Sequence, residues 1–427
     1  VGNTGGSWNF GQRRFKYAPP SGYKALCTQN LADPTIADGS TAMDILLYTG
    51  DGQSSKAVTG YGFSPDFLWI KERNSSSDHG LWNTVVGTGK YSSSNLTTGE
   101  YTTTTELNSI DSAGFTVGSS TMTNESAKTY VAWAWDADDD SSKTYTVKVV
   151  SDSGNKYRFD DFGTSAVTLD LAEGSTYVFD QSDSSNAGHP LRFSTTSDGT
   201  HGGGSEYTTG VTVTGTPGQA GAKTTIVVAA SAPTLFYYCN VHSGMGGQVD
   251  TNSTAGASNF DGTHQSLVHV NSSAGLSIST HSRVTAGSIS TWGHGLSAAP
   301  EFLIMRPTNI TVNWLTYHKK AGNNKRFFLS STSAGNTYGS AVWSSDNTTL
   351  GVNGNIIAGG GTAVDLLVYA WAPVEGYSSF GQYTGNNNAD GPVVYTGMRP
   401  RFILIKRVSA AETWMLIDTE RNTFNVA

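Results

Sequence analysis

The sequence predicts an all-β protein made of several β-sandwich modules, and three observations support this class. Short β-branched and aromatic runs recur from end to end, separated by Gly, Asn and Ser. Aromatic residues make up 11% of the chain, whereas disordered chains are poor in them, so hydrophobic cores are expected. Long runs of the helix formers Ala, Leu, Glu and Lys are missing. A length of 427 residues suggests roughly two to four domains.

Charge and hydropathy argue against several classes of partner. The net charge is −8 and no Lys/Arg run occurs, so binding to nucleic acid is not expected. No stretch approaches the roughly 20 apolar residues that span a bilayer, so membrane insertion is not expected either. The opening VGNTGGSWNF lacks the features of a signal peptide. Cys27 and Cys239 could pair, but they fall in segments assigned to different domains, which leaves the redox compartment open.

One sequence unit occurs three times. Each copy has a Pro, an apolar strand that ends in a cation (FLWIK, FLIMR or FILIK), a polar hairpin and a Trp-led strand. The Pro and Trp positions are Pro65 and Trp82, Pro300 and Trp314, and Pro400 and Trp414. The second and third pairs are fourteen residues apart and the first is seventeen apart, a difference that we assign to an insertion in the hairpin tip.

The strand patterns indicate sandwiches covered on both faces. Phe67 and Trp69 should face one way and Leu68 and Ile70 the other, so both faces of this strand are predicted to be buried. The first two copies close with related strands near 129–138 and 364–380, whereas the third copy has no closing strand and is expected to be truncated. The expected divisions are the end of a sandwich at 1–33, a repeat at 44–138, an inserted domain at 143–250, a repeat at 265–376 and a truncated repeat at 380–427.

Tryptophans recur at equivalent places in the copies. We assign Trp82, Trp314 and Trp414 to one position of the unit and Trp135 and Trp371 to another. Such aromatic residues could form platforms for sugar rings, but they are more often shared core residues, which is the interpretation that we prefer. A bound ligand would then be sought at the variable hairpin tips, 74–80, 308–313 and 409–413.

The inserted segment has a different character. Its predicted strands alternate cleanly at 144–150, 166–172, 175–181, 189–194, 223–230 and 234–239, which indicates another sandwich. His189 follows a glycine at the start of one strand, and Cys239, His242 and Met245 follow at intervals of three residues. This set resembles the ligands of the cupredoxin family. The resemblance implies a Greek-key sandwich and one type-1-like copper site, with two imidazoles and a thiolate in a plane and a weak axial thioether.

Two open points concern this set. The fold could instead serve as a rigid spacer, with the four residues packed without metal. His201 is a further candidate ligand, but we expect it to be a solvated loop histidine.

The repeats carry a second resemblance. WNFGQ at 8–12 resembles the final strand of SPRY-type, concanavalin-like sandwiches, and it is followed by the YTG units and APVEGYSSFG. In this order the motifs resemble virion structural proteins of tailed bacteriophages, especially marine and cyanobacterial ones. The resemblance implies a place on the virion surface, contact with other virion proteins and with a host cell surface that could carry glycans, and a possible homotrimer.

No catalytic motif of the common hydrolase, metalloprotease or nucleotide-binding types occurs, so an enzyme is not predicted. The leading functional hypothesis is a tail-fibre or host-attachment component. Two alternatives are a capsid decoration or head-fibre protein without a receptor role, and a copper-binding redox protein.

Overall fold

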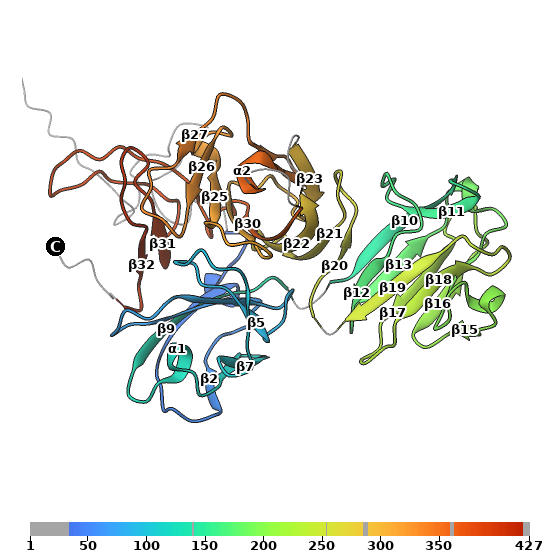
Figure 1. Cartoon of the computed structure of the whole chain (residues 1–427), viewed down its shortest axis with the longest axis horizontal. Coiled ribbons are helices and arrows are strands. Elements are labelled where there is room, and N and C mark those ends of the chain that lie inside the picture. Colours follow the sequence, from blue (N-terminus) through green and yellow to red (C-terminus); the bar gives the residue numbers. More distant parts are fainter. Residues whose placement is uncertain (1–33, 139–140, 253, 285–288, 359–362, 422–427) are drawn as a thin grey trace, which may run out of the picture.

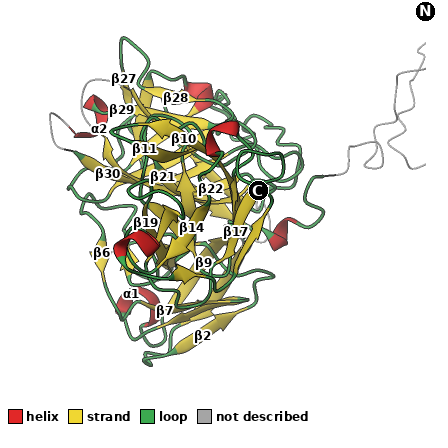
Figure 2. Cartoon of the chain, turned by 90° about the vertical axis from the view of Figure 1, so that its right-hand side faces the viewer, coloured by secondary structure: helices red, strands yellow, loops and turns green. Residues whose placement is uncertain are grey.

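The computed structural model describes residues 34–138, 141–252, 254–284, 289–358 and 363–421 (Figure 1). The predicted all-β class is confirmed, and Figure 2 shows strands throughout the body. The α-helices among the described residues are single turns, and none is long and apolar enough to cross a membrane. The sandwich end predicted at 1–33, with Cys27, lies outside the described residues.

The first repeat is a two-layer sandwich. Its larger sheet has the order β1 (Met43–Thr49), β9 (Thr129–Trp135), β3 (Phe67–Glu72) and β4 (Gly80–Asn83). Its smaller sheet has the order β2 (Lys56–Thr59), β8 (Gly114–Val117) and β7 (Leu107–Asp111). A small hairpin of β5 (Lys90–Tyr91) and β6 (Tyr101–Thr102) and the helix α1 (Thr121–Asn124) complete the unit.

The second repeat has the same elements in the same order. Its larger sheet contains β22 (Leu276–Val284), β30 (Val364–Trp371), β24 (Phe302–Pro307) and β25 (Leu315–His318). Its smaller sheet contains β23 (Ile289–Gly293), β29 (Thr349–Asn353) and β28 (Trp343–Ser345). The hairpin β26 (Lys325–Phe328) and β27 (Asn336–Thr337) and the helix α2 (Asn355–Ala358) correspond to β5, β6 and α1. Two further strands, β20 (Ala257–Asn259) and β21 (Ser266–Asn271), extend the sheet beyond β22.

The two sandwiches pack against each other through their larger sheets. The predicted two-sided burial of β3 is confirmed, because Leu68 and Ile70 lie in the core of the first sandwich while Phe67 and Trp69 lie in a separate shared core. The second sandwich contributes Tyr369 and other residues to that shared core. The repeats therefore form one four-layered body, with a hydrophobic core inside each sandwich and a third core between them.

Within its described residues, the third copy contributes one hairpin, β31 (Phe402–Ile405) and β32 (Met415–Asp418), at the border of the shared core. Phe402 packs edge-to-face on Trp135, with ring centroids 5.2 Å apart. The Trp133 indole donates a 3.1 Å hydrogen bond to the Asp418 carboxylate. All three copies thus meet at the shared core.

The strand registers correct one sequence assignment. In β4, Trp82 lies opposite Leu68 and faces the core of the first sandwich. Trp314 and Trp414 instead stand just before β25 and β32 and face the shared core. The corresponding position in the first copy is His79, because the extra residues precede the strand and shift Trp82 into it. Trp82 is therefore not equivalent to the other two.

The tryptophans are core residues, as expected. Trp82 and Trp314 have no exposed surface, and Trp414 is half-buried, so Trp82 and Trp314 cannot serve as open platforms. Trp135 and Trp371 are equivalent by register, since they pair with Met43 and Leu276 at the same place in the two larger sheets.

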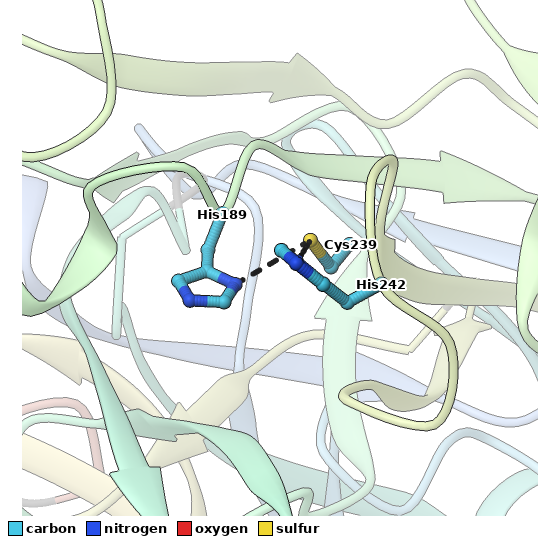
Figure 3. Close-up of side chains that lie close together, drawn as sticks. All are labelled: His189, Cys239 and His242. Carbon is cyan, nitrogen blue, oxygen red and sulfur yellow. Dashed lines mark hydrogen bonds between the residues drawn. The ribbon is translucent and has the colours of Figure 1, made fainter.

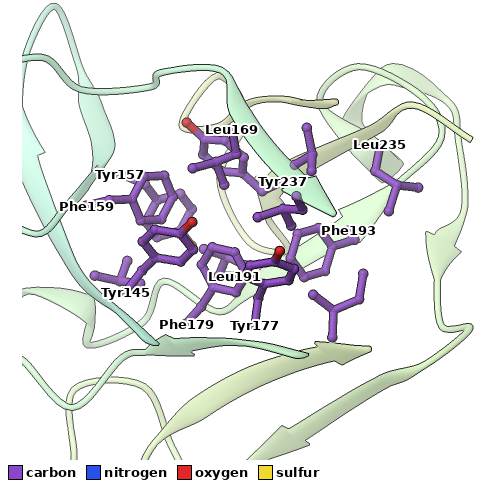
Figure 4. Close-up of a cluster of buried hydrophobic side chains, with 14 of the residues drawn as sticks. Tyr145, Tyr157, Phe159, Leu169, Tyr177, Phe179, Leu191, Phe193, Leu235 and Tyr237 are labelled. Atoms are coloured by element: carbon purple, nitrogen blue, oxygen red, sulfur yellow. The ribbon is translucent and has the colours of Figure 1, made fainter. Parts of the chain in front are cut away.

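The inserted domain is a sandwich of two five-stranded sheets. One sheet has the order β11 (Asn155–Phe159), β10 (Lys143–Ser151), β13 (Thr176–Asp180), β17 (Lys223–Val227) and β16 (Val211–Thr214). The other has the order β12 (Leu169–Ala172), β19 (Gly247–Asn252), β18 (Leu235–Cys239), β14 (Leu191–Ser194) and β15 (Glu206–Tyr207). Aromatic side chains fill the space between the sheets (Figure 4).

The insert is fixed to the repeats at its base. Strand β20 pairs with β21 of the second repeat, yet Ala257 from β20 and the following Phe260 belong to the core of the insert. The hydroxyl of Ser141, just before β10, lies 3.0 Å from the His269 ring and accepts a hydrogen bond from the Gly256 amide. The two crossing segments are thus tied to each other and to the second repeat.

Candidate metal centre

Three potential metal ligands converge at one end of the insert (Figure 3). The Cys239 sulfur lies 3.8 Å from Nδ1 of His189 and 3.7 Å from Nδ1 of His242. The three donor atoms all lie within 4.8 Å of one another. Among the described residues this is the group of His, Cys, Asp and Glu side chains whose donor atoms are close enough to hold one ion.

The strands bring these residues together from distant parts of the chain. Cys239 is the last residue of β18, and His242 lies in the loop that follows. His189 precedes β14, which pairs with β18 so that Leu191 lies opposite Cys239. The antiparallel register therefore places His189 beside the loop, although fifty residues separate it from Cys239.

The spacing of the donor atoms fits a trigonal metal ion. Metal–nitrogen bonds of about 2.0–2.1 Å and a metal–sulfur bond of about 2.3 Å, set at 120°, would separate nitrogen and sulfur by about 3.8 Å. The two observed nitrogen–sulfur distances match this value closely. A thiolate and two imidazoles are also the donor set of trigonal copper sites with a weak axial ligand. The two nitrogen–sulfur distances and the types of donor atom are therefore those that a trigonal copper ion would require.

The three donor residues of the centre differ in their exposure to solvent. Cys239 has no exposed surface, His189 is half-buried and His242 is exposed. Burial, and then the neighbouring His242, lower the pKa of His189, which favours the neutral imidazole that a metal requires. The sulfur is thus protected from solvent while the His242 ring reaches the surface.

Met245, the expected axial ligand, lies in the hydrophobic core of the insert together with Cys239. Its side chain is 1% exposed, and its carbonyl oxygen accepts a 3.0 Å hydrogen bond from the Tyr157 amide. Met245 thus lies in the loop between β18 and β19 with its side chain turned into the core of the insert.

The backbone at His189 is held by buried polar side chains that the sequence did not point to. Its carbonyl oxygen accepts hydrogen bonds from the Tyr157 hydroxyl, at 2.8 Å, and from the Gln181 amide, at 2.9 Å. Its own amide donates to the Asn186 carbonyl at 2.8 Å. Gln181 and Asn186 are almost fully buried, and no motif or spacing in the sequence marks them as supports of the site.

The loop that carries His242 is also fixed. The Gly244 amide donates a 2.8 Å hydrogen bond to the Asp198 carboxylate, and the Gly244 carbonyl accepts from Lys156. Gly244 has a φ of 71°, which favours glycine. At Gly246 a Cβ atom would overlap the carbonyl oxygen of Tyr237, so the loop can pass so close to β18 because it has a glycine there.

His201 stands outside the donor set. It is exposed, as expected, but it lies in the 3-10 helix η4 (Gly199–Gly202) and not in a loop, and its Nε2 atom lies 3.0 Å from the backbone carbonyl oxygen of Cys239. His201 thus contacts the backbone of Cys239, whereas His189 and His242 contact its sulfur.

Comparison with known proteins places the repeats, together with strands β10 and β11 of the insert, in a family. No curated protein and no solved structure matches the chain. The family described as "Domain of unknown function (DUF7483)" matches residues 38–165 and 250–427, which cover both sandwiches and the third hairpin. The unmatched stretch 166–249 contains the metal-ligand candidates. The chain therefore belongs to the DUF7483 family, and its candidate metal centre lies in a segment inserted within the family domain.

Proposed function

We propose that this protein is a rigid β-sandwich scaffold that carries a mononuclear copper centre, held by His189, Cys239 and His242 with Met245 as a weak axial ligand. The observation that carries the proposal is the pair of nitrogen–sulfur distances, 3.8 and 3.7 Å, which suit a trigonal ion. Bound copper would supply one-electron transfer, because thiolate and imidazole together accommodate both Cu(I) and Cu(II).

The residues around the centre suit such a role. The hydrogen bonds to the His189 carbonyl and to the Gly244 backbone hold the ligands in position before metal arrives, which limits rearrangement. The buried Cys239 sulfur is shielded from water, whereas the exposed His242 ring is the part of the centre nearest to an external partner.

The test is a copper titration of the full chain, followed by visible absorption. We expect saturation at one equivalent and an intense thiolate-to-Cu(II) band. The Cys239→Ser variant should lose this band, while Cys27→Ser, a matched cysteine substitution outside the set, should keep it. If the band survives Cys239→Ser, the ligand assignment is wrong; if no copper binds, the insert is a metal-free spacer.

We also propose, from the sequence motifs, that the scaffold is a virion surface component of a tailed bacteriophage and contributes to host attachment. The resemblance of the WNFGQ, YTG and APVEGYSSFG motifs carries this second proposal. The compact body, in which three copies share one core, would suit a mechanically stressed particle surface.

Labelling the chain on intact particles tests the second proposal. A position on fibres, with loss of adsorption after antibody treatment, supports host attachment. A uniform lattice on the capsid would instead indicate a decoration protein without a receptor role, and absence from particles would reject a virion location.

A further inference from the structure

A lysine and an aspartate lie together where the insert begins. Lys143 is the first residue of β10, and Asp160 directly follows β11, the strand that pairs with β10. Nζ of Lys143 lies 3.6 Å from Oδ2 of Asp160, and the two side chains are only 25% and 21% exposed. The same nitrogen lies 5.0 Å from the ring centroid of Tyr145 and 5.8 Å from that of Phe260. An amine and a carboxyl group are therefore held together beside aromatic rings, with little access to water.

This environment favours the uncharged forms of both groups. Burial lowers the pKa of Lys143, although the charges of Asp160 and Asp261 act in the opposite direction. Burial raises the pKa of Asp160, although the charge of Lys143 opposes the rise. Transfer of one proton from Lys143 to Asp160 converts the ion pair into a free amine and a carboxylic acid without changing the total charge. A free amine is a nucleophile, so burial favours the reactive form of the pair.

Hydrogen bonds orient the two groups for a reaction with each other. Nζ of Lys143 donates to the Ser258 carbonyl at 3.3 Å, which holds the nitrogen through a hydrogen atom and leaves the lone pair of the free amine for Asp160. The Thr146 backbone amide donates to Oδ1 of Asp160 at 2.8 Å. Addition of an amine to the carboxyl carbon would place negative charge on an oxygen, and this amide would stabilise that charge on Oδ1. Oδ2, which faces Lys143, is then the oxygen that leaves.

We propose that Lys143 and Asp160 join through a covalent isopeptide bond that forms within the folded chain. Nζ of the free amine attacks Cγ of the carboxylic acid, and a carbon–nitrogen bond forms. The proton that the nitrogen gives up passes to the Oδ2 hydroxyl, the carbon–oxygen bond breaks, and one water molecule leaves. Nothing is oxidised or reduced, and no further reactant is consumed.

A neighbouring ion pair provides an internal control. Lys148 and Asp161 come from the same two segments as Lys143 and Asp160, and their Nζ and Oδ1 atoms are closer together, at 2.7 Å. Asp161 is exposed, however, and its hydrogen bond to Lys148 raises the pKa of that lysine. An ammonium group has no lone pair with which to attack, so this pair should stay an ion pair.

The bond would reinforce the place where the chain enters the insert. It would close a loop of residues 143–160 and link the start of β10 to the end of β11. The two strands could then not separate when the entry segment is pulled, and the unfolded chain would lose conformational freedom. This consequence is independent of the copper centre at the other end of the insert.

Intact mass spectrometry of the full chain under denaturing conditions tests the proposal. We expect a mass that is lower than that of the sequence by one water molecule. Tryptic digestion then locates the loss, because the bond blocks cleavage after Lys143 and joins the peptide 129–148 to the peptide 159–192. This branched peptide comes from the wild-type chain, so its detection does not depend on the folding of a variant.

Substitutions identify the two partners. Lys143→Arg should restore the full mass, because a guanidinium stays protonated and cannot attack. Asp160→Ala should also restore it, because the carboxyl group is removed. Lys148→Arg, the matched control on the same strand, should keep the loss of water and the branched peptide.

Three outcomes would overturn the proposal. One is a wild-type mass that still equals the mass of the sequence after prolonged incubation of the folded chain. Another is a loss of water that persists in Lys143→Arg. The third is a loss that maps to a single unbranched peptide, which would indicate that an aspartate has cyclised onto its own backbone.

Discussion

Trp135 of the first sandwich and Trp371 of the second meet edge-to-face, with ring centroids 6.4 Å apart and an interplanar angle of 68°. They occupy equivalent positions of two repeats, so the copies meet through the same surface of the unit. A contact of this kind makes the two sandwiches stabilise each other, because each covers a hydrophobic sheet face that would otherwise be exposed.

The first prediction concerns this coupling. Trp135→Ala should lower the free energy of unfolding by about 3–5 kcal/mol, because it removes a large side chain from the shared core. The two sandwiches should still unfold together, in one calorimetric transition that moves to lower temperature. If the variant shows two separate transitions, with the second sandwich unaffected, the shared core does not couple the repeats.

The second prediction concerns the close approach of the ligand loop to β18. Gly246→Ala should abolish copper binding, because its Cβ would overlap the Tyr237 carbonyl oxygen and push the loop away. Gly188→Ala is the matched control, since it lies on the other side of the site and a Cβ there meets no atom, although its φ of 78° will cost about 1 kcal/mol. Equal copper affinity of Gly246→Ala and the wild type would show that the loop does not need this approach.

The third prediction concerns Met245. Met245→Leu should keep the thiolate-to-Cu(II) band, because the thioether is a weak axial ligand and the substitution is nearly volume-conserving. The reduction potential should rise, since an apolar side chain in place of a donor favours the lower charge of Cu(I). Voltammetry of both proteins measures the difference, and an unchanged potential would remove Met245 from the metal site.

The fourth prediction is a pH dependence of stability. Asp170 in β12 lies beside Asp250 in β19, and burial, followed by Asp250, raises the pKa of Asp170 to about 6. A raised folded-state pKa gives a stabilisation that is complete below the unfolded value of about 3.9 and is lost as the pH rises through about 6.

Asp170→Asn removes the charge, so it should increase the free energy of unfolding at pH 7.5 by about 1–2 kcal/mol after solvent screening. The same variant should change little at pH 4. Urea unfolding at the two pH values measures the effect. A gain of the same size at both values would show that the charge of Asp170 is not responsible.

The sequence was sufficient for the fold class, and it named the three side chains, His189, Cys239 and His242, that the structure brings together. The alternation of apolar and polar residues in strands, and the three-residue spacing of Cys239, His242 and Met245, are local patterns that can be recognised in the sequence itself. The shared core was not predicted. The pattern of β3 indicates that both faces of the strand are buried, but it does not identify the second sandwich as the element that covers one of them. The place of Trp82 was missed because an insertion near a strand start leaves the sequence alignment ambiguous by several residues, and only the pairing of Trp82 with Leu68 resolves it.

The supporting residues of the site could not be predicted for a related reason. Gln181 and Asp198 act through hydrogen bonds to backbone atoms at His189 and Gly244, and such contacts follow no sequence period. The same holds for the hydrogen bonds that the Trp314 and Trp414 indoles donate to backbone carbonyls, because every residue type has a backbone carbonyl.

The most direct test of the metal centre is the X-ray absorption spectrum of the copper-loaded full chain at the copper edge. We expect one copper per chain, with two nitrogen ligands and one short sulfur ligand in the first coordination sphere. A sphere of nitrogen and oxygen atoms without sulfur would contradict it.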